Sequence, residues 1–290
     1  MFLPHKVLEQ KLLFLLSEDL GQGDVTTSLI VPENSVAEAE VVAKDNGVVA
    51  GIEEGKILLE SLGLKAEVLV RDGSGIKPGQ VLIKMTGNTR KMLSTERTLL
   101  NIISRMSGIA TTTRKIAETL KKAGLKTKVA CTRKTAPGLL YFDKKAVLIG
   151  GGDPHRLHLD DLILIKDNHI TVAGSIERAL KGAKKNASFT KRIEIEVTKP
   201  EHAVAAANAG VDIIMLDNFT PKRIIRTISM LKKAKLYGKA ILEASGGITS
   251  ENVLEFASTG VDIVSLGEIT HSPCALNVSL ELVKTRFSES

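Results

Sequence analysis

Residues 209–214 (AGVDII) and residues 259–264 (TGVDIV) repeat one short pattern, a glycine followed by an almost continuous apolar run. A glycine commonly ends a helix, and such an apolar run is typical of a parallel strand that is covered on both faces. The rhythm extends in both directions and predicts strands at Lys128–Thr132, Leu162–Lys166, Arg192–Val197, Val211–Asp217, Ala240–Ala244 and Val261–Leu266. Helical spacing of apolar residues predicts helices at Ser175–Lys185, Pro200–Ala209, Pro221–Lys233 and Ser250–Ser258. An α/β fold with a parallel sheet follows, and this pattern leaves open whether the sheet forms a barrel or an open doubly wound sheet.

The first part of the chain has a different pattern. Residues Glu38–Ala43 and Lys65–Val70 alternate apolar and polar side chains, as half-buried antiparallel strands do. A long helical pattern then runs from Ser94 through Met106. These features indicate a smaller α/β domain ahead of the parallel sheet.

We therefore expect one domain in residues 1–108 and a second in residues 109–270. The spacing of apolar residues in Ala275–Val283 predicts a helix. The tail that contains it, residues 271–290, is expected to return to the first domain.

The composition restricts the classes of function. The formal net charge is +7, but aromatic residues make up only 3% and there is no Trp, so platforms for stacking bases are scarce. We therefore favour a small, highly anionic substrate over nucleic acid. Two cysteines give no spacing for disulfides or a zinc site. The start lacks the layout of a signal peptide and no apolar run approaches ~18 residues, so a cytoplasmic protein without a membrane span is expected.

Charged residues close four successive predicted strands. Thr132, Arg133 and Lys134 follow the first strand, Lys166 ends the second, Glu196 lies near the end of the third, and Asp217 ends the fourth. A solvated edge would explain one such strand, but four favour a shared polar site, because the carboxyl ends of parallel strands meet at one edge.

The charges at this edge are of two kinds. The cations are suited to carboxylates and phosphates, and they comprise Arg133, Lys134, Arg156 and Lys166, with His155 and His169 as further donors. Glu196 and Asp217 could share Mg²⁺ with substrate oxygens, or each could form a salt bridge with a lysine. Glu194 points to the same face as Glu196 and is expected to pair with an inward lysine.

Two glycine-rich segments complete the predicted site. Ser245, Gly246 and Gly247 precede a predicted helix, so their N–H groups could approach a phosphate, and Gly267 ends the next strand. The segment Gly150–Arg156 is too rich in glycine to be helical. It is either a mobile loop that delivers His155 and Arg156 or a surface turn.

The order and spacing of short motifs over nearly the whole chain resemble the quinolinate phosphoribosyltransferases, which are type II phosphoribosyltransferases. The motifs that carry the resemblance are Glu18–Gly21, Gly23–Thr27, Glu96–Arg97, Leu100–Asn101, Ser107–Thr111, Thr132–Thr135, His155–Arg156, Lys166–His169, Glu194–Val197, Leu216–Asn218, Glu243–Ile248 and Thr270–Ser272. The resemblance implies an open-faced α/β sandwich followed by an incomplete parallel (β/α) barrel, with the tail returning to the sandwich. It also implies a homodimer or an assembly of dimers, in which Arg97 reaches the partner's active site.

The resemblance further implies a pentosyltransferase that converts quinolinate and phosphoribosyl pyrophosphate into nicotinate mononucleotide, CO₂ and pyrophosphate in the de novo synthesis of NAD. Lys166, Glu196 and Asp217 would be catalytic, with Glu196 and Asp217 near Mg²⁺. The residues expected to bind substrate are Arg97, Thr132, Arg133, Lys134, His155, Arg156, Lys166, His169, Glu196, Asp217, Ser245, Gly246, Gly247, Ser265, Leu266, Gly267 and His271.

One position departs from the family pattern. Leu140 stands where the family usually has an arginine, and Lys144 or Lys145 could supply the charge. The alternatives are a paralogous phosphoribosyltransferase that acts on nicotinate or accompanies molybdenum transport and, more remotely, a nucleic-acid-binding protein. The intact Lys166–His169 and Glu96–Arg97 motifs argue against the relative that accompanies molybdenum transport. A nicotinate enzyme binds one substrate carboxylate instead of two, so its pocket should carry fewer cations.

Overall fold

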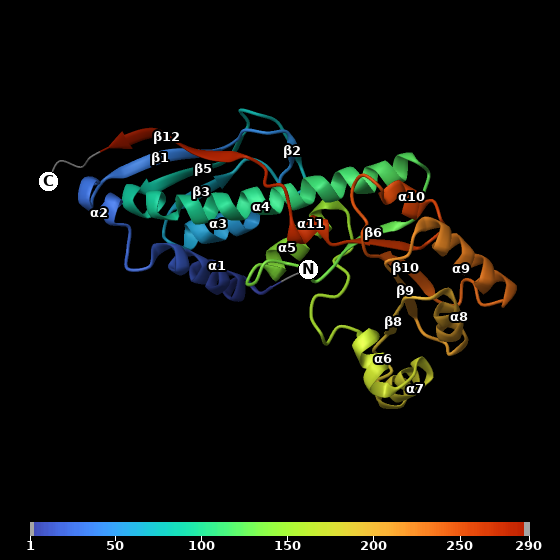
Figure 1. The fold of residues 1–290 in the computed structure, drawn as a ribbon. Coiled ribbons are helices and arrows are strands. Elements are labelled where there is room, and N and C mark those ends of the chain that lie inside the picture. Colours follow the sequence, from blue (N-terminus) through green and yellow to red (C-terminus); the bar gives the residue numbers. More distant parts are fainter. Residues whose placement is uncertain (1–2, 287–290) are drawn as a thin grey trace. The chain divides into compact units, whose positions relative to one another are not determined.

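The computed structural model describes residues 3–286 of the chain (Figure 1). The chain divides into two compact units. The first unit contains the residues up to Thr112, residues 148–150 and the chain from Pro273 onward, and the second contains residues 113–147 and 151–272. Among the described residues, no helix has the length and apolar character needed to cross a bilayer.

The first unit is built on a four-stranded antiparallel sheet with the strand order β12-β1-β5-β3. Its elements are α1 (His5–Leu20), α2 (Val25–Ile30), β1 (Val36–Ala43), β2 (Gly47–Val48), α3 (Ile52–Ser61), β3 (Lys65–Val68), β4 (Gly75–Ile76), β5 (Val81–Asn88), the first part of α4 (Thr89–Lys122) and β12 (Val278–Arg286). Helix α3 packs against β3 and β5, and α1 packs against α3 (Figure 1). Alternate residues of β1 are buried, so the helices cover one face of the sheet, as an open-faced sandwich requires.

The tail forms a strand, so the predicted helix at Ala275–Val283 is wrong. Strand β12 pairs antiparallel with β1 from Val278 opposite Ala43 to Arg286 opposite Val36. Without this pairing, β1 would present a row of free N–H and C=O groups at the edge of the sheet. Hydrogen bonds to a distant segment therefore outweigh the local helical spacing.

Helix α4 is longer than the predicted segment Ser94–Met106. It continues through Gly108, where a Cβ atom would lie 1.9 Å from the carbonyl oxygen of Cys274. The glycine therefore lets the returning tail pass close to the helix backbone.

A matched pair of glycine substitutions tests this packing. Gly108→Ala should lower the free energy of unfolding by about 3 kcal/mol, because a backbone carbonyl occupies the space that the methyl group needs. Gly182→Ala in α7, where no atom lies within 4 Å of the new Cβ, should raise it by about 0.5–1 kcal/mol through helix propensity. Thermal unfolding of both variants measures the difference, and equal Tm values would contradict it.

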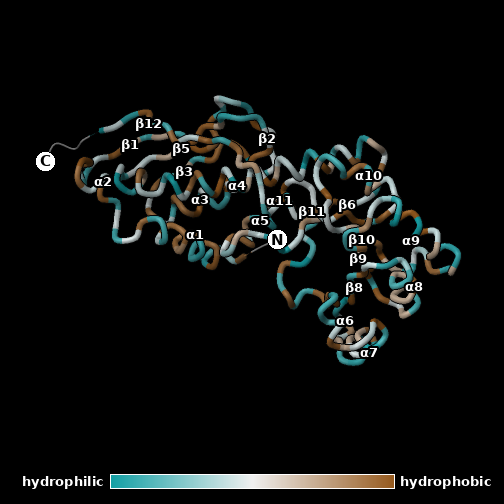
Figure 2. Tube along the Cα trace, viewed as in Figure 1, coloured by the Kyte–Doolittle hydropathy of each residue, from teal (hydrophilic) through white to brown (hydrophobic). Residues whose placement is uncertain are grey.

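The second unit holds six parallel strands in the order β6-β11-β10-β9-β8-β7. Its elements are the end of α4, β6 (Lys128–Cys131), α5 (Leu140–Gly150, which ends in the first unit), β7 (Ile163–Ile165), α6 (Asp167–Ala173), α7 (Ile176–Asn186), β8 (Ile193–Val197), α8 (Pro200–Asn208), β9 (Ile213–Asp217), α9 (Pro221–Lys233), β10 (Ile241–Ser245), α10 (Val253–Ala257), β11 (Ile263–Leu266) and α11 (Glu268–His271). Strands β6 and β7 do not pair, so the barrel is incomplete and the predicted fold class is confirmed. The helices alternate hydrophilic and hydrophobic residues, in keeping with one face against the sheet (Figure 2).

The free edge of β6 is partly occupied by the segment that follows α5. Asp153 forms an isolated parallel bridge with Ala130, and its N–H donates to the carbonyl oxygen of Val129 at 2.8 Å. This short pairing fixes the start of the segment that carries His155 and Arg156.

Candidate active site

A cavity of about 730 Å³ lies at the carboxyl ends of the parallel strands. All six strands or the loops that follow them contribute to its wall, as expected where the loops after parallel strands gather. The residues predicted from the sequence that line it are Thr132, Arg133, Lys134, His155, Arg156, Lys166, Glu196, Asp217, Ser245, Gly246, Gly247, Ser265, Gly267 and His271.

Cations dominate one part of this wall. Arg156 is only 7% exposed, and burial together with the neighbouring guanidinium of Arg133 lowers its pKa. An arginine nevertheless stays charged at neutral pH. Two guanidinium groups held close together repel each other, and a bound dicarboxylate or phosphate would relieve that repulsion through bidentate hydrogen bonds.

Lys166 and Glu196 form an ion pair across the strands β7 and β8. Lys166 Nζ lies 2.7 Å from Glu196 Oε2, and the lysine side chain is 44% exposed. The pair is accessible from the cavity, so it can exchange its contact for one with a substrate at little cost in desolvation. On β9, Asp217 Oδ2 accepts a hydrogen bond from Asn218 Nδ2 at 2.8 Å.

Residues 245–248 form a glycine turn after β10. Gly246 has φ +94° and Gly247 has φ +65°, so both take the left-handed backbone region that favours glycine. Gly246, Gly247 and Ile248 all line the cavity. The predicted helix after this turn begins only at Val253, because Thr249 N donates to Asn252 Oδ1 at 2.8 Å and Ser250 N donates to Glu268 Oε1 at 2.5 Å. Glycines in this backbone region let main-chain N–H groups come close to an anion.

A matched pair of variants tests the role of this turn. In Gly246→Ala the new Cβ would lie 2.3 Å from Asn218 Oδ1 and 2.9 Å from Asn218 N, so the turn must move. We expect a loss of about 10²-fold in kcat/KM for the phosphorylated substrate, because a shift of about 1 Å in a positioning group has that effect. Gly238→Ala has a similar φ of +83° but open space around the Cβ, and it should leave kcat/KM unchanged. Steady-state kinetics decide the matter, and equal rates in both variants would exclude the turn from the site.

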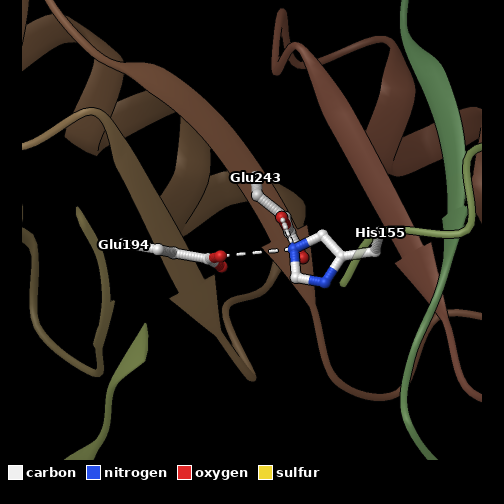
Figure 3. Close-up of side chains that lie close together, drawn as sticks. All are labelled: His155, Glu194 and Glu243. Atoms are coloured by element: carbon white, nitrogen blue, oxygen red, sulfur yellow. Dashed lines mark ion pairs between the residues drawn. The ribbon is translucent and has the colours of Figure 1, made fainter. Parts of the chain in front are cut away.

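His155 lies between two buried carboxylates at the wall of the cavity (Figure 3). Its Nε2 atom is 3.2 Å from Glu194 Oε2 and 3.3 Å from Glu243 Oε2, and the two glutamates are 0% and 1% exposed. Glu194 therefore pairs with a histidine, and the predicted pairing with an inward lysine is wrong. Burial opposes charge on the ring, but the attraction of the two carboxylates beside Nε2 outweighs burial and raises the pKa of His155 to about 10. Burial also raises the pKa of Glu194.

Three residues predicted to bind substrate do not line this cavity. Arg97 is exposed on α4 in the first unit. His169 uses Nδ1 to accept a hydrogen bond from Lys166 N at 2.9 Å, which caps α6. Leu266 is buried in β11.

Lys144 does not supply a charge to the cavity, although the sequence made it a candidate. Its side chain is fully buried in α5, and Nζ donates to Pro154 O at 2.5 Å and lies 3.3 Å from Cys131 Sγ. Lys145 does not line the cavity either. The arginine that Leu140 replaces is therefore not compensated by these two lysines, and Lys144 instead fixes the backbone beside His155.

Five polar residues that line the cavity were not among the predicted site residues: Asn218, Glu243, Thr249, Glu268 and Ser272. Glu243 could have been found, because it lies two residues before Ser245 in the same strand and so points to the same face. Glu194 and Glu196 show the same spacing in β8. Glu268 directly follows the predicted site residue Gly267. The hydrogen bond that its carboxylate accepts from Ser250 N joins two separate loops, so no local sequence pattern predicts this contact.

The open parallel barrel and the cation-rich cavity at its carboxyl edge define an α/β enzyme that acts on an anionic substrate. A family model for the quinolinate phosphoribosyl transferase C-terminal domain matches residues 109–281, and the model for the N-terminal domain matches residues 24–107. The chain belongs to the quinolinate phosphoribosyl transferase family.

Relatives and solved structures agree with this membership. The chain is 47% identical to a probable nicotinate-nucleotide pyrophosphorylase [carboxylating] of Archaeoglobus fulgidus, over 90% of this chain and 99% of that protein. It is 36% identical to the human nicotinate-nucleotide pyrophosphorylase [carboxylating], over 85% of this chain and 82% of that one. The crystal structure of NadC from Streptococcus pyogenes is 33% identical, with a TM-score of 0.88 and full coverage of both chains.

Proposed function

We propose that this chain catalyses the conversion of quinolinate and phosphoribosyl pyrophosphate into nicotinate mononucleotide, CO₂ and pyrophosphate, a step of NAD biosynthesis. The observation that carries the proposal is the cavity, which gathers four cations and two accessible carboxylates from the motifs that define the family. The proposal keeps the cytoplasmic location that the sequence predicts.

In this proposal the cations hold the two carboxylates of quinolinate and the phosphates of the second substrate. Arg133 and Arg156 are suited to carboxylates, because a guanidinium presents paired N–H donors in a fixed plane. The backbone of the glycine turn (residues 245–248), which lines the cavity, suits the 5′-phosphate. His169 and Leu266 would not contact the substrate through their side chains. They would instead hold the backbone of the neighbouring cavity residues, Lys166 and Gly267, in place.

The reaction then requires positioning and charge more than covalent chemistry. The pyridine nitrogen of quinolinate attacks the anomeric carbon of the ribose, and the bond to pyrophosphate breaks with its electron pair on the leaving oxygen. Positive charge develops on the ribose, where Glu196 and Asp217 stabilise it. The ring becomes a pyridinium, and as CO₂ departs the electron pair of the C–C bond stays on the ring carbon, where the adjacent positively charged nitrogen stabilises it. A proton then replaces the carboxylate on that carbon. Holding both reactants in line supplies much of the rate.

Glu196 and Asp217 have the chemistry to hold Mg²⁺ together with the substrate. Each makes a protein contact through one oxygen, to Lys166 and to Asn218, and among the described residues the other oxygen of each has no protein partner. Neither belongs to a described group of three protein ligands, which fits an ion held partly by substrate and water. Mg²⁺ would neutralise the departing pyrophosphate.

The proposal also includes a homodimer, or an assembly of dimers, in which Arg97 reaches the partner's active site. Helix α2 supports an assembly because three of its six residues, Val25, Leu29 and Ile30, are large, apolar and exposed. Clustered apolar exposure of this kind is typical of an interface.

The experiment that tests the activity follows product formation from quinolinate, phosphoribosyl pyrophosphate and Mg²⁺, with nicotinate as the parallel substrate. Nicotinate mononucleotide and CO₂ from quinolinate alone are expected. Turnover of nicotinate, or of neither compound, would overturn the assignment in favour of a paralogous phosphoribosyltransferase.

A further inference from the structure

The backbone around His155 is fixed at three points. Its N–H donates to Asp153 Oδ1 at 2.7 Å, and Lys144 Nζ donates to the carbonyl oxygen of Pro154. Asp153 itself bridges to Ala130 of β6. His155 has φ +52°, a left-handed conformation that a residue with a side chain adopts only where its surroundings impose it. The loop is therefore built to hold this histidine in one place.

The ring of His155 is fixed as firmly as its backbone. Glu194 on β8 and Glu243 on β10 both direct a carboxylate at Nε2, and Nδ1 is turned away from both (Figure 3). Among the described residues, no hydrogen bond of good geometry satisfies the oxygens of either glutamate. Two buried carboxylates without other partners need a counter-charge, and the ring is placed to provide it.

The charges of this cluster balance without an added ion. Arg156 follows His155 in the chain and attracts Glu194, so two cations face two anions. The other charged groups at the ring are Asp153, bonded to the His155 N–H, and Lys144, bonded to Pro154 O. The three ligand-type atoms of the cluster could also surround a metal ion, but a neutral quartet already explains why the carboxylates are tolerated in the interior.

We propose that Glu194 and Glu243 are positioning residues, which hold the His155 ring from beneath the cavity so that its Nδ1–H is presented to a carboxylate of quinolinate. This inference rests on the proposed function. An imidazole held at Nε2 by two carboxylates is kept as the imidazolium, so both ring nitrogens carry a proton. A neutral ring with its only proton at Nε2 would instead direct a lone pair at the anionic substrate.

The kinetic test replaces Glu243 by glutamine, with Glu243→Asp as the conservative variant that keeps the charge. We expect Glu243→Gln to raise KM for quinolinate by about 10- to 100-fold, because a charge-assisted hydrogen bond to the substrate is weakened. KM for phosphoribosyl pyrophosphate should change by less than about twofold, and Glu243→Asp should restore part of the loss. The matched control is Glu54→Gln, which removes another carboxylate that is 0% exposed, in the first unit, and it should leave both KM values unchanged.

The dependence of KM for quinolinate on pH tests whether the charge on His155 is responsible for the effect of Glu243→Gln. In the parent protein the pKa of His155 is about 10, so the imidazolium persists and KM for quinolinate should stay flat between pH 7 and pH 9. In Glu243→Gln one of the groups that raise the pKa is gone, so the ring loses its proton at lower pH. KM for quinolinate should then rise steeply over the same interval.

Nitrogen-15 NMR of the histidine side chains provides a readout that is independent of turnover. The signal of His155, assigned by its loss in His155→Asn, should report a doubly protonated ring up to pH 9 in the parent protein. It should titrate at least about one pH unit lower in Glu243→Gln and in Glu194→Gln. The parent spectrum alone tests the charge state if either variant fails to fold.

Defined outcomes would overturn this proposal. A neutral His155 at pH 7 in the parent would do so, as would an unchanged KM for quinolinate in Glu243→Gln. One equivalent of divalent metal in the purified parent, lost in Glu243→Gln, would replace it with a metal site. If the parent protein does not turn over quinolinate while His155 stays doubly protonated, the proposed function is wrong. The charge state of His155 and its placement by the two glutamates would still hold.

Discussion

Lys166→Ala should lower kcat/KM for quinolinate by about 10²- to 10³-fold, the usual loss when one preorganised charged donor is removed from an active site. Lys166 Nζ contacts Glu196 at 2.7 Å on the wall of the cavity, so the substitution removes a cation and leaves a carboxylate facing the anionic substrate. The lysine is nearly half exposed, so the fold should not depend on it, and Tm should shift by no more than about 2–4 °C.

Two further variants provide the control for Lys166→Ala and test whether Lys166 acts together with Glu196. Lys181→Ala removes an exposed lysine of α7 in the same unit and should leave the rate unchanged. Lys166→Ala combined with Glu196→Gln tests whether the pair acts as a unit, in which case the double variant is little worse than Lys166→Ala alone. Independent losses that multiply, measured by steady-state kinetics, would contradict a shared role.

The six parallel strands were predictable from the sequence because a strand buried on both faces leaves an almost continuous apolar run. The same reasoning placed Lys166, Glu196 and Asp217 together, since the ends of parallel strands share an edge and all three residues line one cavity. Local pattern was sufficient here because each strand's own sequence determines which of its ends carries the polar residues.

The failures have one physical cause, which is that the deciding partner is distant in sequence. The tail forms β12 because it supplies hydrogen bonds to the edge of β1. The local sequence of Ala275–Val283 contains no information about this distant partner. Glu194 found His155 instead of a lysine because a bridge to β6 brings the loop beneath the cavity. Lys144, a candidate for the cavity, is fully buried and bonds a backbone carbonyl.

The buried cluster shows why a charged residue at a strand end can be misjudged from sequence. Glu194 and Glu243 each lie two residues before a residue that lines the cavity, so alternation places all four on one face. Alternation alone does not reveal depth along the barrel axis, and depth decides whether a carboxylate meets the substrate or a protein cation. His155 supplies that cation from the break between β6 and β7, where the barrel is incomplete.

Arg97→Ala should reduce activity by about 10³-fold or more, if Arg97 completes the active site of the partner subunit as proposed, because the substrate then loses a charged donor that nothing else supplies. The side chain is exposed on α4, so its removal should leave Tm unchanged within about 2 °C. The exposed lysine Lys91 lies on the same helix, and its Nζ donates to the carbonyl oxygen of Leu62 at 2.8 Å. Lys91→Ala is therefore the matched control and should retain full activity.

Mixing the inactive variants Arg97→Ala and Lys166→Ala distinguishes a shared site from a self-contained one. In a mixed dimer, the subunit that keeps Lys166 receives an intact Arg97 from its partner, while the other site carries both defects. Random pairing at equal concentrations should therefore restore about a quarter of the parent activity, because half of the dimers are mixed and each has one complete site. Subunit exchange is verified with differently tagged chains before the assay. If verified mixed dimers stay inactive, Arg97 serves its own subunit or none, and the contribution across the interface is wrong.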